Sequence, residues 1–137
     1  MAERRPNRIL GPYHDEFWGY CNKDELRLQK CNHCDYVSWP ATAACLDCGT
    51  EGDFTWERFS GRGKIISWCA FEREYYPGIL PLPWDTILVR LDEGPIFLSN
   101  PNGFSYSDIH SGMPVKVTFV DCEDEAGEFK LPVFERA

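Results

Sequence analysis

The sequence has no long hydrophobic run, and this absence argues against whole classes of protein. No stretch of the 137 residues approaches the roughly 18 consecutive apolar residues that a membrane-spanning helix needs. The first residues, Met1–Leu10, carry arginines but no apolar segment after them, so we expect no secretory signal peptide. These features predict a cytoplasmic protein without membrane contacts.

Positive charge is also scarce. Lys and Arg number 14 against 22 Asp and Glu, which gives a net charge of −8. Nine of the acidic residues, against three basic ones, fall within residues 91–137. Such a chain repels phosphate backbones at long range, which argues against general nucleic-acid binding and still permits a local basic pocket.

Cysteine, by contrast, is plentiful. The chain has seven cysteines, and in a reducing cytoplasm they indicate metal binding or packing rather than disulfides. Four of them form two Cys-X-X-Cys pairs, Cys31 with Cys34 and Cys45 with Cys48, separated by ten residues. Four sulfurs in a tetrahedron, at about 2.3 Å from the ion, suit a structural zinc and leave no open position for a substrate. Iron in a rubredoxin-like site would use the same ligands and stays open as an alternative.

The residues around the two pairs refine this picture. Gly49 suits the tight backbone after the second pair, whereas Asp35 stands after the first pair, where glycine would be more comfortable. The other cysteines, Cys21, Cys69 and Cys122, lack paired spacing and are expected to be core or surface thiols.

Ten prolines and eleven glycines leave little room for long helices. Residues 13–22 place aromatic residues and Cys21 near one side at helical spacing, which predicts one short amphipathic helix. From residue 54 onward apolar and polar residues alternate, with a turn at 60–63, a hairpin at 86–98 and an acidic turn at 121–127. We therefore expect a mainly β protein, with a short N-terminal helix and a four-cysteine zinc ribbon in residues 1–52 and a five-stranded OB-fold barrel in residues 53–137.

One segment breaks the β pattern. Residues Tyr75–Trp84 contain three prolines and yet are strongly apolar. This loop either folds back over an end of its own barrel or docks into a partner protein. We favour docking, because clusters of exposed aromatic and aliphatic side chains mark interaction surfaces.

Several segments together resemble a known family. They are Phe17-Trp18, Leu26–Cys31, Trp39-Pro40, Ser60–Gly63, Val89–Gly94, Ser111–Val115 and Leu131–Phe134. In order and spacing they resemble the proteins of domain-of-unknown-function family thirty-five, which join a zinc ribbon to an OB-fold and are described as acyl-CoA-associated. Asp35 is a small departure, because the family tends to have glycine there.

The resemblance implies a non-catalytic subunit. Members of this family are small partner subunits of thiolase-like enzymes, which act as acyl-CoA thiolases, acyltransferases or steroid side-chain aldolases. The small subunit is thought to help form the coenzyme A site and to stabilise the catalytic subunit. We accordingly expect a hetero-tetramer with a thiolase-like partner, docked through Tyr75–Trp84. Steroid, aromatic succinyl and short-chain acyl groups all remain open as substrates, as does the choice between thiolysis and retro-aldol cleavage.

The residues agree with this implication. Claisen or retro-aldol chemistry needs a nucleophile or base with a positioned partner, and no such pattern is recognisable, so we assign no catalytic residue. Coenzyme A needs Arg or Lys for its phosphates and an aromatic or apolar face for adenine. The candidates around the ribbon are Arg27, Lys30, Trp39, Arg62 and Lys64. Arg62 and Lys64 flank Gly63 in a turn whose amides could also face a phosphate, although each of these residues fits ordinary surface charge equally well.

Two other functions compete with the accessory subunit. The first is a redox protein with iron in the four-cysteine site. The second is a nucleic-acid-binding zinc-ribbon and OB-fold protein, in which Trp56, Trp68 and Phe71 would serve as stacking platforms. The sequence shows no basic groove that would support nucleic-acid binding.

Overall fold

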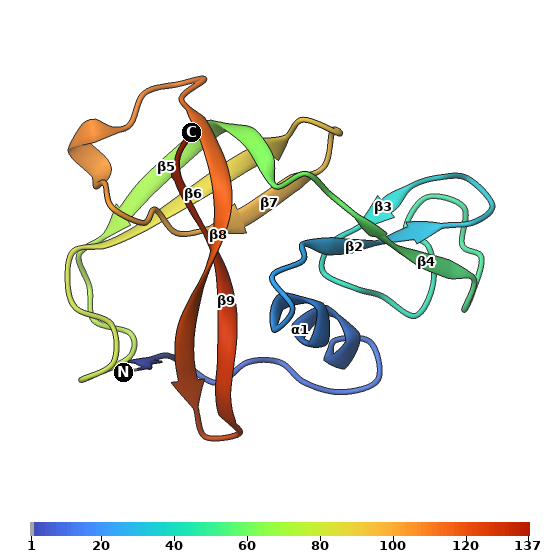
Figure 1. The fold of residues 1–137 in the computed structure, drawn as a ribbon, viewed down its shortest axis with the longest axis horizontal. Helices are drawn as coiled ribbons and strands as arrows, with labels where there is room; N and C mark the ends of the chain where they lie inside the picture. Colours follow the sequence, from blue (N-terminus) through green and yellow to red (C-terminus); the bar gives the residue numbers. More distant parts are fainter. Residues whose placement is uncertain (1) are drawn as a thin grey trace.

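The strands form two sheets that lie side by side (Figure 1). The computed structural model describes residues 2–137. The smaller sheet has the order β3-β2-β4, with β2 at Arg27–Cys31, β3 at Val37–Ser38 and β4 at Phe54–Arg58. The larger sheet has the order β1-β8-β5-β6-β7, with β9 also paired to β8. Its strands are β1 (Glu3–Arg4), β5 (Arg62–Phe71), β6 (Trp84–Leu91), β7 (Ile96–Ser99), β8 (Pro114–Asp124) and β9 (Gly127–Arg136).

The larger sheet closes on itself as a barrel. Beyond the end of β7, Pro101 forms a parallel bridge with Phe134 of β9. The Asn102 amide donates to the Phe134 carbonyl at 2.7 Å, and the Phe134 amide donates to the Asn100 carbonyl at 3.1 Å. Strands β5 to β9 therefore make the predicted five-stranded barrel. The short β1 adds to its outside by pairing in parallel with β8.

Two glycines allow the barrel strands to approach closely. Gly61 has a φ of +77°, and a Cβ there would overlap the side chain of Val117. A Cβ on Gly63 would overlap the carbonyl oxygen of Arg90 on the neighbouring strand β6. Gly61 and Gly63 are thus required for close strand packing, since a Cβ at either position would force the chain away from its neighbours.

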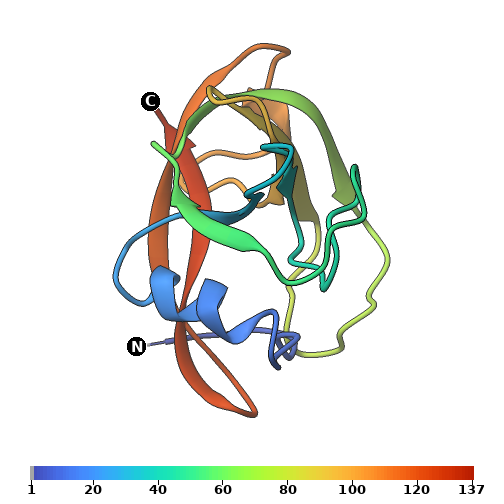
Figure 2. The ribbon, with the colours of Figure 1, turned by 90° about the vertical axis from the view of Figure 1, so that its right-hand side faces the viewer.

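Helix α1 (Asp15–Cys21) and the smaller sheet share one core with the barrel. Phe17 and Cys21, one helical turn apart, are both fully buried, as the helical spacing predicts. The Trp39 ring, just after β3, lies 4.1 Å from the Phe17 ring and 5.0 Å from the Phe97 ring of β7. Figure 2 shows α1 and the smaller sheet lying against the same side of the barrel. These aromatic contacts join helix, ribbon and barrel into one packed unit.

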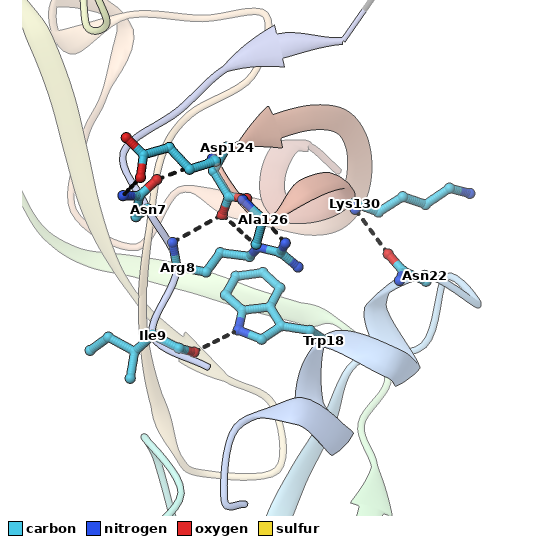
Figure 3. Close-up of polar contacts among 9 residues, drawn as sticks. Asn7, Arg8, Ile9, Trp18, Asn22, Asp124, Ala126 and Lys130 are labelled. Atoms are coloured by element: carbon cyan, nitrogen blue, oxygen red, sulfur yellow. Dashed lines mark hydrogen bonds and ion pairs between the residues drawn. The ribbon is translucent and has the colours of Figure 1, made fainter. Parts of the chain in front are cut away.

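The N-terminal arm fastens the β8–β9 hairpin to α1 (Figure 3). The Arg8 guanidinium donates to both carboxylate oxygens of Asp124, from Nε at 2.7 Å and from the terminal nitrogen at 3.2 Å. The same guanidinium lies 4.0 Å from the centre of the Phe129 ring and 5.5 Å from that of Trp18. Trp18 in turn donates from its indole nitrogen to the Ile9 carbonyl at 3.3 Å.

Most predicted elements are present, and two are placed differently. Strand Phe54–Arg58, which we expected in the barrel, pairs with β2 in the smaller sheet, so the ribbon continues beyond residue 52. The acidic segment Asp121–Gly127 is not a long turn, because β8 and β9 remain paired up to Asp124 and Gly127. At the end of β8, the buried Asp124 carboxylate is paired with Arg8. Among residues 2–137, no helix has the length and apolar character needed to cross a membrane.

Candidate functional site

Two similar chain turns present the four paired cysteines. In the first turn the Asp35 amide donates to the Cys31 carbonyl at 3.0 Å, and in the second the Gly49 amide donates to the Cys45 carbonyl at 3.0 Å. Both closing residues adopt the left-handed conformation, with φ of 64° at Asp35 and 78° at Gly49. The expectation that glycine would suit position 35 better than aspartate is therefore confirmed. Asp35 is the strained residue of the two, because an L-residue with a side chain disfavours the left-handed conformation.

The four sulfur atoms converge on one point. All four lie within 4.8 Å of one another. The Cys31 and Cys48 sulfurs are 3.7 Å apart, and those of Cys34 and Cys45 are 3.5 Å apart. A tetrahedral zinc with bonds of about 2.3 Å requires sulfur separations of about 3.8 Å. The ligand set therefore fits zinc, which would brace the ribbon and, with four protein ligands, keep no position for a substrate.

Backbone amides donate hydrogen bonds to two of the four sulfurs. The amides of His33 and Asp47 each donate to a cysteine sulfur two residues earlier, at 3.4 Å. Hydrogen bonds with the Thr50 side chain and backbone lower the pKa of Cys48 to about 6. Burial and hydrogen bonds with the other three sulfurs instead raise the pKa of Cys34 to about 12, so Cys48 is more easily ionised than Cys34 to the thiolate that binds metals.

His33 faces away from the sulfur cluster. Its Nε2 lies 2.6 Å from a carboxylate oxygen of Asp53, whose other oxygen accepts from the Asn32 side chain at 2.8 Å. Hydrogen bonds from Asn32 and then His33 lower the pKa of Asp53. These contacts tie the first turn to the segment that leads into β4, and they leave the ion to the four cysteines.

The remaining thiols lie outside any metal cluster that residues 2–137 form. Cys21 and Cys122 are buried, while Cys69 is exposed on β5. Burial raises the pKa of Cys21 to about 12 and also raises the pKa of Cys122. The two buried thiols therefore serve as core residues, as predicted, rather than as nucleophiles.

Three of the five residues predicted for coenzyme A have internal roles. Arg27 donates to Glu25 at 2.7 Å and to the Trp56 carbonyl at 3.1 Å. Lys30 lies 3.5 Å from a carboxylate oxygen of Glu57. Trp39 belongs to the aromatic cluster between ribbon and barrel described above. These side chains stabilise the ribbon through contacts within the chain, a role that we did not predict from the sequence.

The other two, Arg62 and Lys64, are exposed on the outer face of β5. They lie at the start of a strand instead of within the turn. The turn itself already holds a carboxylate, because Glu93 accepts from the Ser60 amide at 2.7 Å and from its hydroxyl at 3.2 Å. Any contact of these two residues with a phosphate would therefore involve their side chains on the sheet surface.

The loop after β5 forms an exposed apolar surface. Tyr75 is 62% exposed, Tyr76 48% and Leu82 43%. The surface borders a hollow of about 340 Å³ lined by Phe71, Arg73, Tyr75, Tyr76, Leu80, Leu82 and Trp84. None of residues 75–84 belongs to the buried core of the described chain.

The three predicted stacking rings do not share one surface. Trp56 lies in the smaller sheet, 6.1 Å from the Tyr20 ring, whereas Trp68 and Phe71 lie on β5 of the barrel. Residues three apart on a strand point to opposite faces, which separates Trp68 from Phe71 as well.

Comparison with known proteins agrees with this architecture. A family model described as "ChsH2, rubredoxin-like zinc ribbon domain" matches residues 18–54, and one described as "ChsH2, C-terminal OB-fold domain" matches residues 56–120. A "DUF35 domain-containing scaffold protein" of Pyrococcus furiosus is 30% identical over 93 residues, which cover 64% of this chain and 63% of that protein. The chain belongs to the DUF35 family.

Two other similar proteins are longer than this chain or more distant from it in sequence. A "Probable enoyl-CoA hydratase alpha subunit" of Thermomonospora curvata is 29% identical over 124 residues, covering 88% of this chain but only 37% of that protein. The chain thus spans less than two thirds of the length of either relative. A solved structure called "Ltp2-ChsH2(DUF35) aldolase" superimposes with a TM-score of 0.81 at 24% identity, covering 95% of this chain and 98% of the other. This last likeness establishes the shared fold.

Proposed function

We propose that this DUF35 chain is a non-catalytic, zinc-binding subunit of a thiolase-like complex that cleaves carbon–carbon bonds in an acyl-CoA. The family supports this role, since one relative is named a scaffold protein and another a hydratase alpha subunit. The similar fold in a structure named an aldolase points in the same direction. The four thiolates form a complete zinc shell, so the metal braces the ribbon rather than activating a substrate.

The observation that carries the proposal is the exposed apolar surface of Tyr75–Trp84. Two tyrosines and a leucine, each more than two-fifths exposed, surround an apolar hollow. Aromatic side chains that fill or border pockets supply most of the energy of protein interfaces. Docking of the catalytic subunit on this surface would remove these side chains from water and hold the two subunits together.

The coenzyme contact is a separate part of the proposal. Arg62 and Lys64 begin β5, whereas the loop follows its last residue, Phe71. Arg62 and Phe71 are nine residues apart on this strand, which corresponds to at most about 30 Å, so the two basic residues and the proposed docking surface lie near opposite ends of the strand. The two functions can therefore be tested by independent substitutions.

Co-expression with a thiolase-like catalytic subunit tests the docking surface. We expect the two chains to co-elute with the mass of a hetero-tetramer, and Tyr75→Ser combined with Tyr76→Ser to abolish co-elution while zinc remains bound. Tyr13→Ser is the matched control, because Tyr13 is 47% exposed on a different segment. If the double variant co-elutes like the control, the loop is not the docking surface.

A further inference from the structure

A small polar pocket lies at the end of the barrel where β6 begins. Its volume is about 220 Å³, and its walls come from β1, the loop before β6, the segment after β7 and strands β8 and β9. None of the described residues that border it belongs to the zinc ribbon, and its only residue in common with the hollow at Tyr75 and Tyr76 is Trp84. In Figure 1, β1 and the loop before β6 lie at the side of the barrel away from the smaller sheet. The pocket is therefore a second cavity, apart from the ribbon and from Arg62 and Lys64.

The guanidinium of Arg5 borders this pocket with one nitrogen unpaired. The Arg5 side chain is only 10% exposed, and one of its terminal nitrogens lies 3.5 Å from a Glu3 carboxylate oxygen. The guanidinium carbon lies 4.6 Å from the centre of the Trp84 ring. Its Nε is buried and has no hydrogen-bond acceptor among residues 2–137. A buried donor without an acceptor is costly, so this nitrogen favours any ligand that offers one.

Asp85 borders the same pocket with one carboxylate oxygen unpaired. Its backbone carbonyl accepts from the Asn100 side chain at 2.8 Å, and its Oδ2 accepts from the Tyr106 amide at 3.1 Å. These two bonds hold the carboxylate in place. Its Oδ1 is buried without a donor, and no ion pair engages Asp85, in the part of the chain that the structure describes. Arg5 and Asp85 thus line one pocket without pairing with each other.

The charges of the pocket favour a neutral ligand that both donates and accepts. Two carboxylates, Glu3 and Asp85, and one guanidinium, Arg5, border it, so an anion would meet a surplus of negative charge. A simple cation would leave the Arg5 Nε without an acceptor. A primary carboxamide meets both needs, because its oxygen accepts and its nitrogen donates, and it has no charge to desolvate.

We propose that this pocket binds a small molecule in which a primary carboxamide is attached to an apolar body. The amide oxygen accepts from the Arg5 Nε, and the amide nitrogen donates to the Asp85 Oδ1. The apolar body packs against Phe104 and Val133, which line the same pocket. An apolar cavity of about 150 Å³ holds one benzene molecule, so a pocket of about 220 Å³ has room for a ring of that size with its amide. The site does not depend on the proposed function, since it involves neither the coenzyme nor a catalytic subunit.

NMR titration of the isotope-labelled, zinc-loaded chain with benzamide tests this site. We expect saturable shifts of the residues that border the pocket, above all Trp84 and Asp85, with the millimolar affinity of so small a ligand. Benzoate and benzamidine have nearly the same shape, but benzoate lacks the donor and benzamidine lacks the acceptor. Each should therefore bind about tenfold more weakly than benzamide. Equal binding of all three ligands would show that only the ring is recognised, and it would overturn the proposal.

The variant Asp85→Asn reverses the polarity of one contact. Its side-chain oxygen can keep the bond from the Tyr106 amide, which places the new amino group at the position of Oδ1, where it faces the donor of benzamide. We expect benzamide to bind about tenfold more weakly and benzoate, which accepts at both oxygens, to bind more tightly than to the unmodified chain. Arg5→Met, which removes Nε and keeps an apolar stem, should weaken benzamide binding by a similar factor. Asp92→Asn is the matched control, because Asp92 is exposed in the turn after β6, and it should leave both affinities unchanged.

The outcomes separate this proposal from the docking proposal. An unchanged order of the three ligands in Asp85→Asn, or no binding of benzamide to the unmodified chain, overturns the site even if the subunits co-elute. If benzamide does not bind and Asp85→Asn instead disrupts co-elution, the pocket receives a side chain of the catalytic subunit and the proposal is wrong. Conversely, the expected order of ligands in a chain that never joins a catalytic subunit supports the site and refutes only the proposed function.

Discussion

Replacement of Arg8 by Met should lower the free energy of unfolding by a measurable amount. Arg8 pairs with Asp124, whose side chain is only 1% exposed, and no other cation contacts that carboxylate among residues 2–137. Removal of one partner of a buried ion pair costs about 3 to 5 kcal/mol, because the remaining charge stays buried without compensation. We expect the lower value, about 3 kcal/mol, because the backbone amides of residue 8 and Ala126 still donate to the Asp124 carboxylate.

Urea unfolding, followed by tryptophan fluorescence and circular dichroism, measures this loss at neutral pH. Arg4→Met is the matched control, since Arg4 is an exposed arginine on the same arm. We expect Asp124→Asn to cost less than Arg8→Met, and the double variant to cost less than the sum of the two. A loss below about 1 kcal/mol for Arg8→Met, typical of a surface pair, would refute the role of Arg8 in fastening the hairpin.

The same pair predicts an acid transition. The Arg8 side chain, assisted by backbone amides, lowers the pKa of Asp124 from its ordinary 3.8 to about 2. A depressed carboxyl pKa adds stability above the unfolded pKa of about 3.9, here about 2 kcal/mol, and this contribution disappears as the pH falls from about 4 to below 2. Stability measured across this range should therefore fall less steeply in Asp124→Asn than in the unmodified protein.

Three further predictions concern the ribbon and the barrel. Asp35→Gly should stabilise the zinc-loaded protein by about 1 kcal/mol in urea unfolding, and a loss of stability would contradict the strain at this position. Purified protein should be colourless with one zinc per chain, and Cys48→Ser should lose the metal and melt at a lower temperature; a red, iron-containing protein would instead support the redox alternative. Gly63→Ala should cost about 3 kcal/mol, measured by urea unfolding, because its Cβ would overlap the Arg90 carbonyl; a near-neutral effect would show that β5 can move.

Local patterns predicted the local features of this protein well. The spacing of the four cysteines was sufficient for the metal site, since a Cys-X-X-Cys turn depends on a few neighbouring residues. The strain at Asp35 was visible from its comparison with Gly49 for the same reason. The alternation of apolar and polar residues predicted a strand at Phe54–Arg58 but not the sheet that it joins. A period of two residues shows which side chains share a face of the strand, and it does not show which strand lies beside it.

Features that depend on distant residues were missed. Asp124 reads as part of a solvated acidic turn until Arg8, 116 residues away, is seen to cover it. We predicted Trp39 and Arg27 as coenzyme contacts, yet the Trp39 ring stacks on the Phe97 ring and Arg27 donates to the Trp56 carbonyl of their own chain. Likewise, only the pairing of β5 with β6 shows that Arg90 stands directly opposite Lys64.

The central claim is that the chemistry takes place on another subunit, which this chain holds through Tyr75–Trp84. The most direct test is the mass and composition of the complex after co-expression with a thiolase-like subunit, compared with the Tyr75→Ser, Tyr76→Ser variant. The account predicts co-elution at a fixed ratio with one zinc per small subunit, and separate elution of the variant with its zinc retained. Separate elution of the unmodified chains, together with full activity of the larger subunit alone, would contradict it.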